Sequence, residues 1–205
     1  MTISLENIGK RFNYEWVFRH LSTGFHAGNS YAILGPNGSG KSTLLQLLAG
    51  SLQHSEGSIR YSLGNRPLPQ EQVFRHLALA TPYLELIEEL TLMELLRFHA
   101  RFKPFLPGVS LPQIMKAVQL EKAADKQIRY FSSGMKQRAR LAQAVFSDVP
   151  VLFLDEPCSN LDAEGIGLYG QLIREYQRER LVVISSNDEQ EYSLCTHRLS
   201  ISDYK

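Results

Sequence analysis

Short apolar runs alternate along the chain with stretches of helical periodicity. The runs are compact and uninterrupted, which indicates strands covered on both faces: residues 31–34, 77–81, 150–154 and 181–185. Good helix formers or apolar residues at helical spacing occupy other segments: residues 44–49, 92–98 and 135–145. Strands that alternate with helices are typical of an α/β fold with a parallel sheet.

The N-terminal residues 2–34 predict several strands separated by turn residues. Within them Phe12, Tyr14, Trp16 and Phe18 alternate, and a regular strand would place all four rings on one face. We expect the rings to pack into a small sheet. The alternative is that one of them offers a flat face to a purine ring.

Residues from about 83 to 145 have a mainly helical pattern inside the otherwise alternating chain. Thr91 followed by Glu94 is a capping-box sequence at the start of a helix. This stretch predicts a helical subdomain inserted into one domain that spans residues 1–205.

Composition narrows the class of protein. The chain is 43% hydrophobic and 21% charged with a net charge of +1, so it has no broad basic field and we expect no nucleic-acid partner. The chain contains no apolar run of membrane-spanning length and no signal peptide, which predicts a cytosolic protein. Cys158 and Cys195 lack metal-ligand spacing, and we expect both to be reduced and unpaired.

The most specific pattern follows the run at residues 31–34. Gly35-Pro36-Asn37-Gly38-Ser39-Gly40-Lys41-Ser42-Thr43 has the spacing G-x-x-x-x-G-K-S of a phosphate-binding loop. Its glycines let successive N–H groups turn toward phosphate oxygens, and the helix that follows presents its positive end. Lys41 would reach the outer phosphates, Ser42 would offer its hydroxyl to Mg²⁺, and Thr43 would lie close to an inner phosphate.

Two adjacent carboxylates, Asp155 and Glu156, follow the run at residues 150–154. They cannot both point into the core, and the carboxyl edge of a parallel sheet is where ligands bind. The pair therefore predicts a site for a divalent cation beside a group that accepts a proton. Ser159-Asn160-Leu161-Asp162 then leads into a helix expected to reach about Arg178.

A second anion site is predicted where Phe131-Ser132-Ser133-Gly134 precedes the helical segment 135–145. Serines can cap this helix while N–H groups of its first turn remain free for an anion. Lys136, Arg138 and Arg140 on the same helix form either a nucleic-acid patch or a solvated face. We expect the solvated face.

Taken in order, these motifs resemble those of the nucleotide-binding subunits of ATP-binding cassette (ABC) transporters over nearly the whole chain. The family's phosphate loop matches residues 35–43, its signature matches 131–135, its Walker B strand ends at Asp155 and Glu156, and its D-loop matches 159–162. The resemblance implies an α/β P-loop NTPase fold, with a mixed sheet core, an antiparallel β subdomain and an inserted α-helical subdomain.

The resemblance also implies roles for particular residues. Phe12 would stack on adenine, with Tyr14 and Trp16 as open alternatives. Two subunits would meet head to tail as a homodimer or heterodimer, with ATP between the phosphate loop of one and Ser132, Ser133 and Gly134 of the other. Asp155 would hold Mg²⁺ through water, and Glu156 would deprotonate the attacking water.

Three motifs depart from the family pattern. The signature is usually Leu-Ser-Gly-Gly-Gln, and Phe131, Ser133 and Met135 differ from it. The family's glutamine falls on Pro82, so that Tyr83 or Glu85 would have to substitute. Its switch histidine falls on Asn187, which can donate a hydrogen bond to the γ-phosphate but cannot carry charge. We expect slow hydrolysis that uses Glu156, Lys41 and Asn187.

The expected function is therefore that of a transport ATPase, peripheral at the inner face of the cell membrane, whose partner is a separate integral membrane subunit. Within this interpretation the compact size resembles that of small exporter-type subunits, such as those of haem or cytochrome c maturation systems. The alternative is a soluble ABC ATPase that assembles cofactors or complexes without transport. A role in DNA repair or translation is disfavoured because the chain has neither a long coiled coil nor a second cassette.

Overall fold

The computed structural model describes residues 1–177 and 179–205. Its central sheet is entirely parallel, with the strand order β6-β7-β8-β3-β9. The strands span Leu77–Ala80 (β6), Val151–Asp155 (β7), Leu181–Ser185 (β8), Ser30–Leu34 (β3) and His197–Ser200 (β9). Every residue of β7 and β8 is buried, which confirms the prediction from their unbroken apolar runs.

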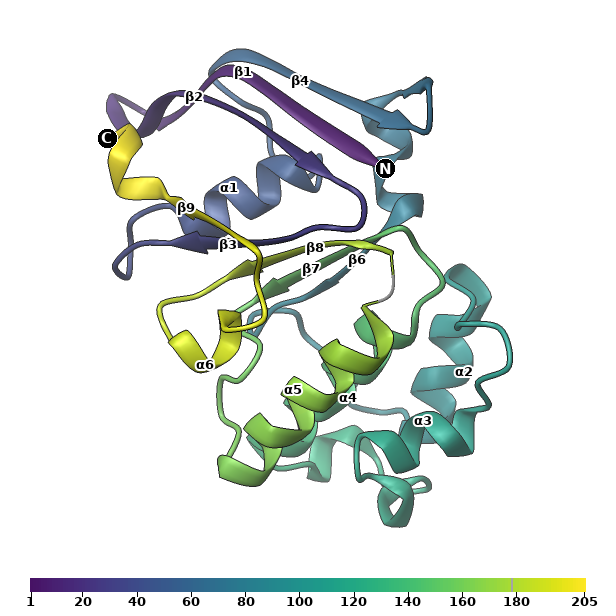
Figure 1. Cartoon of the computed structure of the whole chain (residues 1–205). Helices are drawn as coiled ribbons and strands as arrows, with labels where there is room; N and C mark the ends of the chain where they lie inside the picture. Colours follow the sequence, from purple (N-terminus) through teal and green to yellow (C-terminus); the bar gives the residue numbers. More distant parts are fainter. Residues whose placement is uncertain (178) are drawn as a thin grey trace.

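A second, antiparallel sheet has the order β2-β1-β4-β5. Its strands span Glu15–His26 (β2), Thr2–Phe12 (β1), Glu56–Leu63 (β4) and Arg66–Leu68 (β5). Helix α1, Lys41–Leu48, lies between this sheet and the parallel one (Figure 1). One continuous core fills the space, because apolar residues of β1, β2, α1 and one face of the parallel sheet pack together.

The prediction of one strand carrying four aligned rings is wrong. The chain reverses at Asn13, where φ is 53°, and Phe12 pairs with Glu15 across the hairpin between β1 and β2. Phe18 is fully buried, whereas Tyr14 is 94% exposed at the turn. An asparagine that adopts a left-handed conformation ended the strand within an alternating pattern.

The other face of the parallel sheet is covered by helices (Figure 1). They span Leu92–Phe102 (α2), Leu111–Ala117 (α3), Ser133–Phe146 (α4) and Ala163–Tyr176 (α5), with the short Glu189–Tyr192 (α6) near the end of the chain. The capping box predicted at Thr91 and Glu94 is present at the start of α2. Helix α5 ends at Tyr176, and the predicted end near Arg178 lies outside the described residues.

Candidate functional site

The phosphate-loop sequence connects β3 to α1 at the carboxyl edge of the parallel sheet. Gly40 is the N-cap of α1 with φ 106°, and a Cβ on it would lie 2.4 Å from Cγ1 of Val17. Gly35 has φ 150°, and a Cβ there would lie 2.6 Å from Oγ of Ser39. Both positions require glycine, because the left-handed backbone and the close neighbours leave no room for a side chain.

The ammonium group of Lys41 is folded back against this loop. Its Nζ donates hydrogen bonds to the carbonyl oxygens of Gly35 at 2.8 Å and Pro36 at 3.2 Å, and the residue is only 5% exposed. A buried ammonium bonded to neutral carbonyls gains a stronger, charge-assisted partner when an anion enters the loop. The lysine is thus poised to bind phosphate.

The buried carboxylate of Asp155 ends β7 with one oxygen unpaired. Its Oδ1 has no hydrogen-bond partner within the described part of the chain, and neither has Oγ of Ser185, its neighbour across the β7–β8 pair. A buried charged oxygen without a partner is costly unless it is paired with charge or bound water. An acidic oxygen beside a hydroxyl suits Mg²⁺, a hard cation that keeps its own waters.

Glu156 is the next residue and has φ 44°, a conformation that is strained for a glutamate. Its N–H donates to the carbonyl oxygen of Ser185 at 2.9 Å, which fixes this strained turn to the end of β8. Its Oε2 accepts a hydrogen bond from Oγ of Ser159 at 3.4 Å. The side chain lines a cavity of about 590 Å³ together with Lys41 and Ser42.

This cavity brings together most of the residues predicted to bind nucleotide. Its lining consists of Phe12, Val17, Asn37, Gly38, Gly40, Lys41, Ser42, Thr43, Tyr83 and Glu156. Of the three candidate aromatics, only Phe12 lines it, with a ring that is half exposed and has the ammonium of Lys10 4.7 Å from its centroid. The geometry therefore favours Phe12 over Tyr14 and Trp16 as the ring that could stack on a purine.

Tyr83 and Glu85, the two candidates to replace the family's glutamine, line different cavities. Tyr83 is 77% exposed and lines the cavity that also holds Lys41 and Glu156. Glu85 instead lines a groove beside α2. Tyr83 is thus the candidate that reaches the cavity beside Lys41.

Asn187, at the switch position after β8, contacts the phosphate loop directly. Its Nδ2 donates a 2.7 Å hydrogen bond to Oδ1 of Asn37. Both asparagines line a second cavity of about 380 Å³, together with Glu156 and Glu191. The sequence did not predict this pairing or the involvement of Glu191, since contacts between such distant segments leave no local signal.

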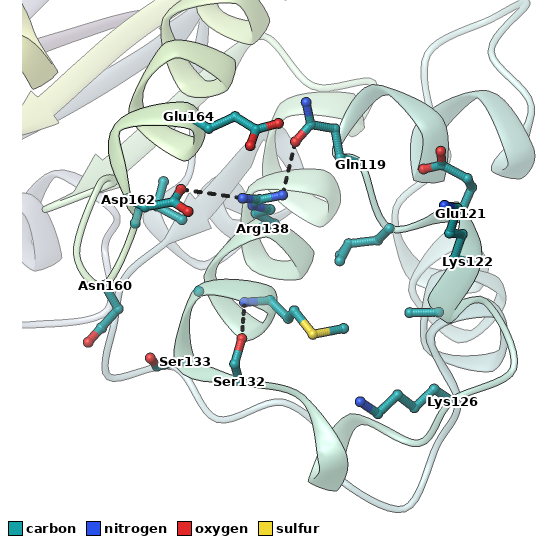
Figure 2. A pocket seen from close by; sticks show the side chains of 15 residues that line it. Gln119, Glu121, Lys122, Lys126, Ser132, Ser133, Arg138, Asn160, Asp162 and Glu164 are labelled. Carbon is teal, nitrogen blue, oxygen red and sulfur yellow. Dashed lines mark hydrogen bonds and ion pairs between the residues drawn. The ribbon is translucent and has the colours of Figure 1, made fainter.

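The signature serines do not join the phosphate loop within one chain. Ser132 is the N-cap of α4, where its Oγ accepts a hydrogen bond from the N–H of Met135 at 3.2 Å. Ser132, Ser133 and Gly134 line a separate pocket of about 680 Å³. Lys122 and Lys126 stand across this pocket from the serines (Figure 2).

The expectation that the cations of α4 form a solvated face is wrong. Lys136 is paired with Glu88, and Arg140 donates from Nε to the carbonyl oxygen of Leu84 at 2.7 Å. Arg138 donates to Gln119 at 3.0 Å and forms a 3.5 Å ion pair with Asp162, as Figure 2 shows. These contacts link α4 to neighbouring segments and leave the three cations only partly exposed.

Cys158 and Cys195 are both free thiols. Among the described residues, we find no helix with the length and apolar character that crossing a bilayer requires.

Comparison with known proteins agrees with this geometry. The family model described as ABC transporter matches residues 18–159. An uncharacterized ABC transporter ATP-binding protein of Bacillus subtilis, YxlF, is 33% identical over 90% of this chain, which spans 62% of that relative's length. The cytochrome c biogenesis ATP-binding export protein CcmA of Brucella abortus is 28% identical over 91% of this chain and 85% of its own.

The fold has a counterpart among solved structures. A bacterial ABC transporter cassette solved as a dimer superposes with a TM-score of 0.81 at 22% identity, covering 97% of this chain and 94% of that one. Together with the family match, these observations identify the chain as a member of the ABC transporter family, an ATP-binding cassette that hydrolyses ATP.

Proposed function

We propose that this chain is the ATP-binding subunit of an ABC transporter, in which two copies bind ATP head to tail between them. The observation that carries the proposal is the separation of two half-sites on one chain. The cavity around Lys41 offers a phosphate loop, and the distinct pocket at Ser132 offers hydroxyls, a helix start and lysines. Each half suits phosphate, and a second copy supplies to each the half that it lacks.

In this arrangement the residues of the phosphate-loop cavity and of the second cavity at Asn187 have separate roles. Phe12 stacks on the adenine, the N–H groups of residues 35–43 and the Lys41 ammonium hold the phosphates, and Asn187 orients the terminal phosphate. Ser42 and Asp155 would hold Mg²⁺, in keeping with the unpaired Oδ1 of Asp155. When bound, Mg²⁺ neutralises charge that develops on the phosphate oxygens.

Glu156 takes the proton of the attacking water. Its place directly after β7, next to Asp155 and in a cavity that Lys41 also lines, supports this role. Little covalent chemistry is asked of the protein in phosphoryl transfer, and positioning with charge neutralisation supplies most of the rate.

A groove beside α2 supports a membrane-subunit partner. Its lining is mostly apolar, and the rings of Phe98 and Phe102 are 43% and 73% exposed there. Lys103 and Glu85 lie among the apolar lining residues. We assign the groove to a short amphipathic helix from a cytoplasmic loop of the membrane subunit, because such a helix inserts an apolar face and leaves polar groups at the border. The cassette then sits at the cytoplasmic face of the membrane.

Purification from detergent-solubilised membranes tests this assignment. Tagged wild-type chain should retain a multi-span membrane protein, identified by mass spectrometry, and Phe102→Asp should lose it. Phe74→Asp, which alters another exposed ring outside the groove, should retain it. Purification without any membrane subunit, while Mg·ATP still binds, would favour the soluble ABC ATPase instead.

A further inference from the structure

Glu191 is a buried glutamate that links two segments of the nucleotide site. It lies on α6, is 5% exposed, and its Oε1 accepts a 2.6 Å hydrogen bond from the backbone N–H of Cys158. Cys158 comes two residues after Glu156, at the start of the segment that leads to Asp162. One carboxyl group thus reaches from the segment after β8 to the segment after β7.

The backbone of Glu191 is held by a separate contact. The hydroxyl of Tyr169 on α5 donates a 2.8 Å hydrogen bond to the backbone carbonyl oxygen of Glu191. The backbone of α6 is therefore held by α5, while the Glu191 side chain is left to hold Cys158. The two contacts can be removed separately, because one uses the backbone and the other the carboxyl group.

The environment of the Glu191 carboxyl group favours a neutral hydrogen-bond acceptor over a charged one. Burial raises the pKa of its carboxyl group, and the nearby charges of Asp188 and Glu156 raise it further. Hydrogen bonds from Ser186 and from the Cys158 N–H act in the opposite direction. A neutral amide of the same length would keep the acceptor oxygen and lose only a charge that this environment disfavours.

We propose that Glu191 is a positioning residue for ATP hydrolysis, which holds the Glu156–Asp162 segment in register with Asn187. Glu191, Glu156 and Asn187 line the same cavity of about 380 Å³. Asn187 is hydrogen-bonded to Asn37, and Glu191 is hydrogen-bonded to Cys158. The segment after β8 therefore contacts both the phosphate loop and the Glu156–Asp162 segment. The inference rests on the proposed role of Glu156 as the base.

Two substitutions distinguish the effect of the length of the Glu191 side chain from the effect of its charge. Glu191→Gln keeps the length of the side chain and an acceptor oxygen, whereas Glu191→Asp keeps the charge and is too short to reach the Cys158 N–H. We expect the glutamine variant to keep kcat within about twofold of wild type and the aspartate variant to lose about tenfold, the effect of one lost hydrogen bond to a buried donor. The Kd for Mg·ATP should be unchanged in both.

Tyr169→Phe is the matched control, because it removes the backbone anchor of α6 and leaves the Glu191 side chain in place. It should lower the unfolding free energy with little change in kcat. Equal kcat values for the aspartate and wild-type proteins, or a glutamine variant as slow as the aspartate one, would overturn the proposal. Glu156→Gln, measured alongside, reports on the proposed base independently: full turnover there would refute that role.

Discussion

Asn187 donates a 2.7 Å hydrogen bond from its side-chain amide to Oδ1 of Asn37, a residue 150 positions earlier in the chain. The contact joins the end of β8 to the phosphate loop after β3, two strands that pair in parallel. It also engages the amide that is proposed to orient the terminal phosphate. ATP binding must therefore compete with Asn37 for this donor or share it.

Histidine at position 187 should raise turnover. An imidazolium is a charged donor, and a charge-assisted hydrogen bond to phosphate is stronger than that of a neutral amide, so Asn187→His should increase kcat by about fivefold. Steady-state phosphate release measures it, with Asn37→Ala as a control that frees Asn187 without adding charge. A lower kcat in the histidine variant would mean that the asparagine belongs to a site adapted to it.

Gly40→Ala should abolish ATP binding. The new Cβ would meet Val17 at 2.4 Å on a backbone with φ 106°, a strain of about 1 to 3 kcal/mol that the loop relieves only by moving. Gly167→Ala is the control, because that exposed glycine of α5 has no atom near the added Cβ. It should stabilise the fold by about 0.5 to 1 kcal/mol. Urea unfolding and calorimetric titration with Mg·ATP measure both effects.

Tyr83 should support hydrolysis in place of the family's glutamine, whose own position is occupied by Pro82. Removing its hydroxyl in Tyr83→Phe takes a hydrogen-bond donor from the cavity shared with Glu156, and kcat should fall about threefold. Glu85→Gln changes a residue of the neighbouring groove and should leave the kcat of the isolated chain unchanged. A lower kcat in Glu85→Gln than in Tyr83→Phe would contradict the assignment.

Acidification should destabilise the fold through His99. Burial, with the positive charge of Lys103, lowers the pKa of His99 from 6.5 to about 4. Between these values the unfolded chain binds a proton that the native protein does not, so stability is lost as the pH falls below about 6.5. From pH 6.5 to 5 this amounts to about 2 kcal/mol.

Urea unfolding of wild type and His99→Gln at pH 7 and pH 5 measures this loss. The variant should lose about 2 kcal/mol less between the two values, since it has no imidazole to protonate. His26→Gln, at an exposed histidine, should behave like wild type. An identical pH dependence for all three proteins would show that folding does not lower the pKa of His99.

Local signals explain what could be predicted from the sequence. The strands β7 and β8 are unbroken apolar runs, and Thr91 with Glu94 forms its capping box within a single turn, so neighbours in the chain determine each structure. The phosphate loop is equally local, because glycine spacing alone sets its backbone angles.

The mispredicted features depend on distant partners or on a single backbone conformation. Lys136 and Glu88 form their ion pair across 48 positions, and Glu191 reaches Cys158 across 33, so no periodicity foretells either contact. The prediction of a continuous strand through Asn13 was wrong for another reason. One left-handed residue broke an alternation that otherwise fits a continuous strand.

Glu156→Gln should bind Mg·ATP and hydrolyse it at least about 100-fold more slowly than wild type, since the proton of the attacking water then lacks an acceptor. Phosphate release under saturating ATP measures the loss. Unchanged turnover would remove Glu156 from the role of base.

The same variant gives the most direct test of the head-to-tail site. Light scattering on Glu156→Gln in saturating Mg·ATP should give twice the 23.3 kDa of one chain, with the monomer mass restored when ATP is removed or when Ser132→Arg is added. A sample that binds ATP fully but stays at 23.3 kDa would contradict ATP being held between two copies of this chain.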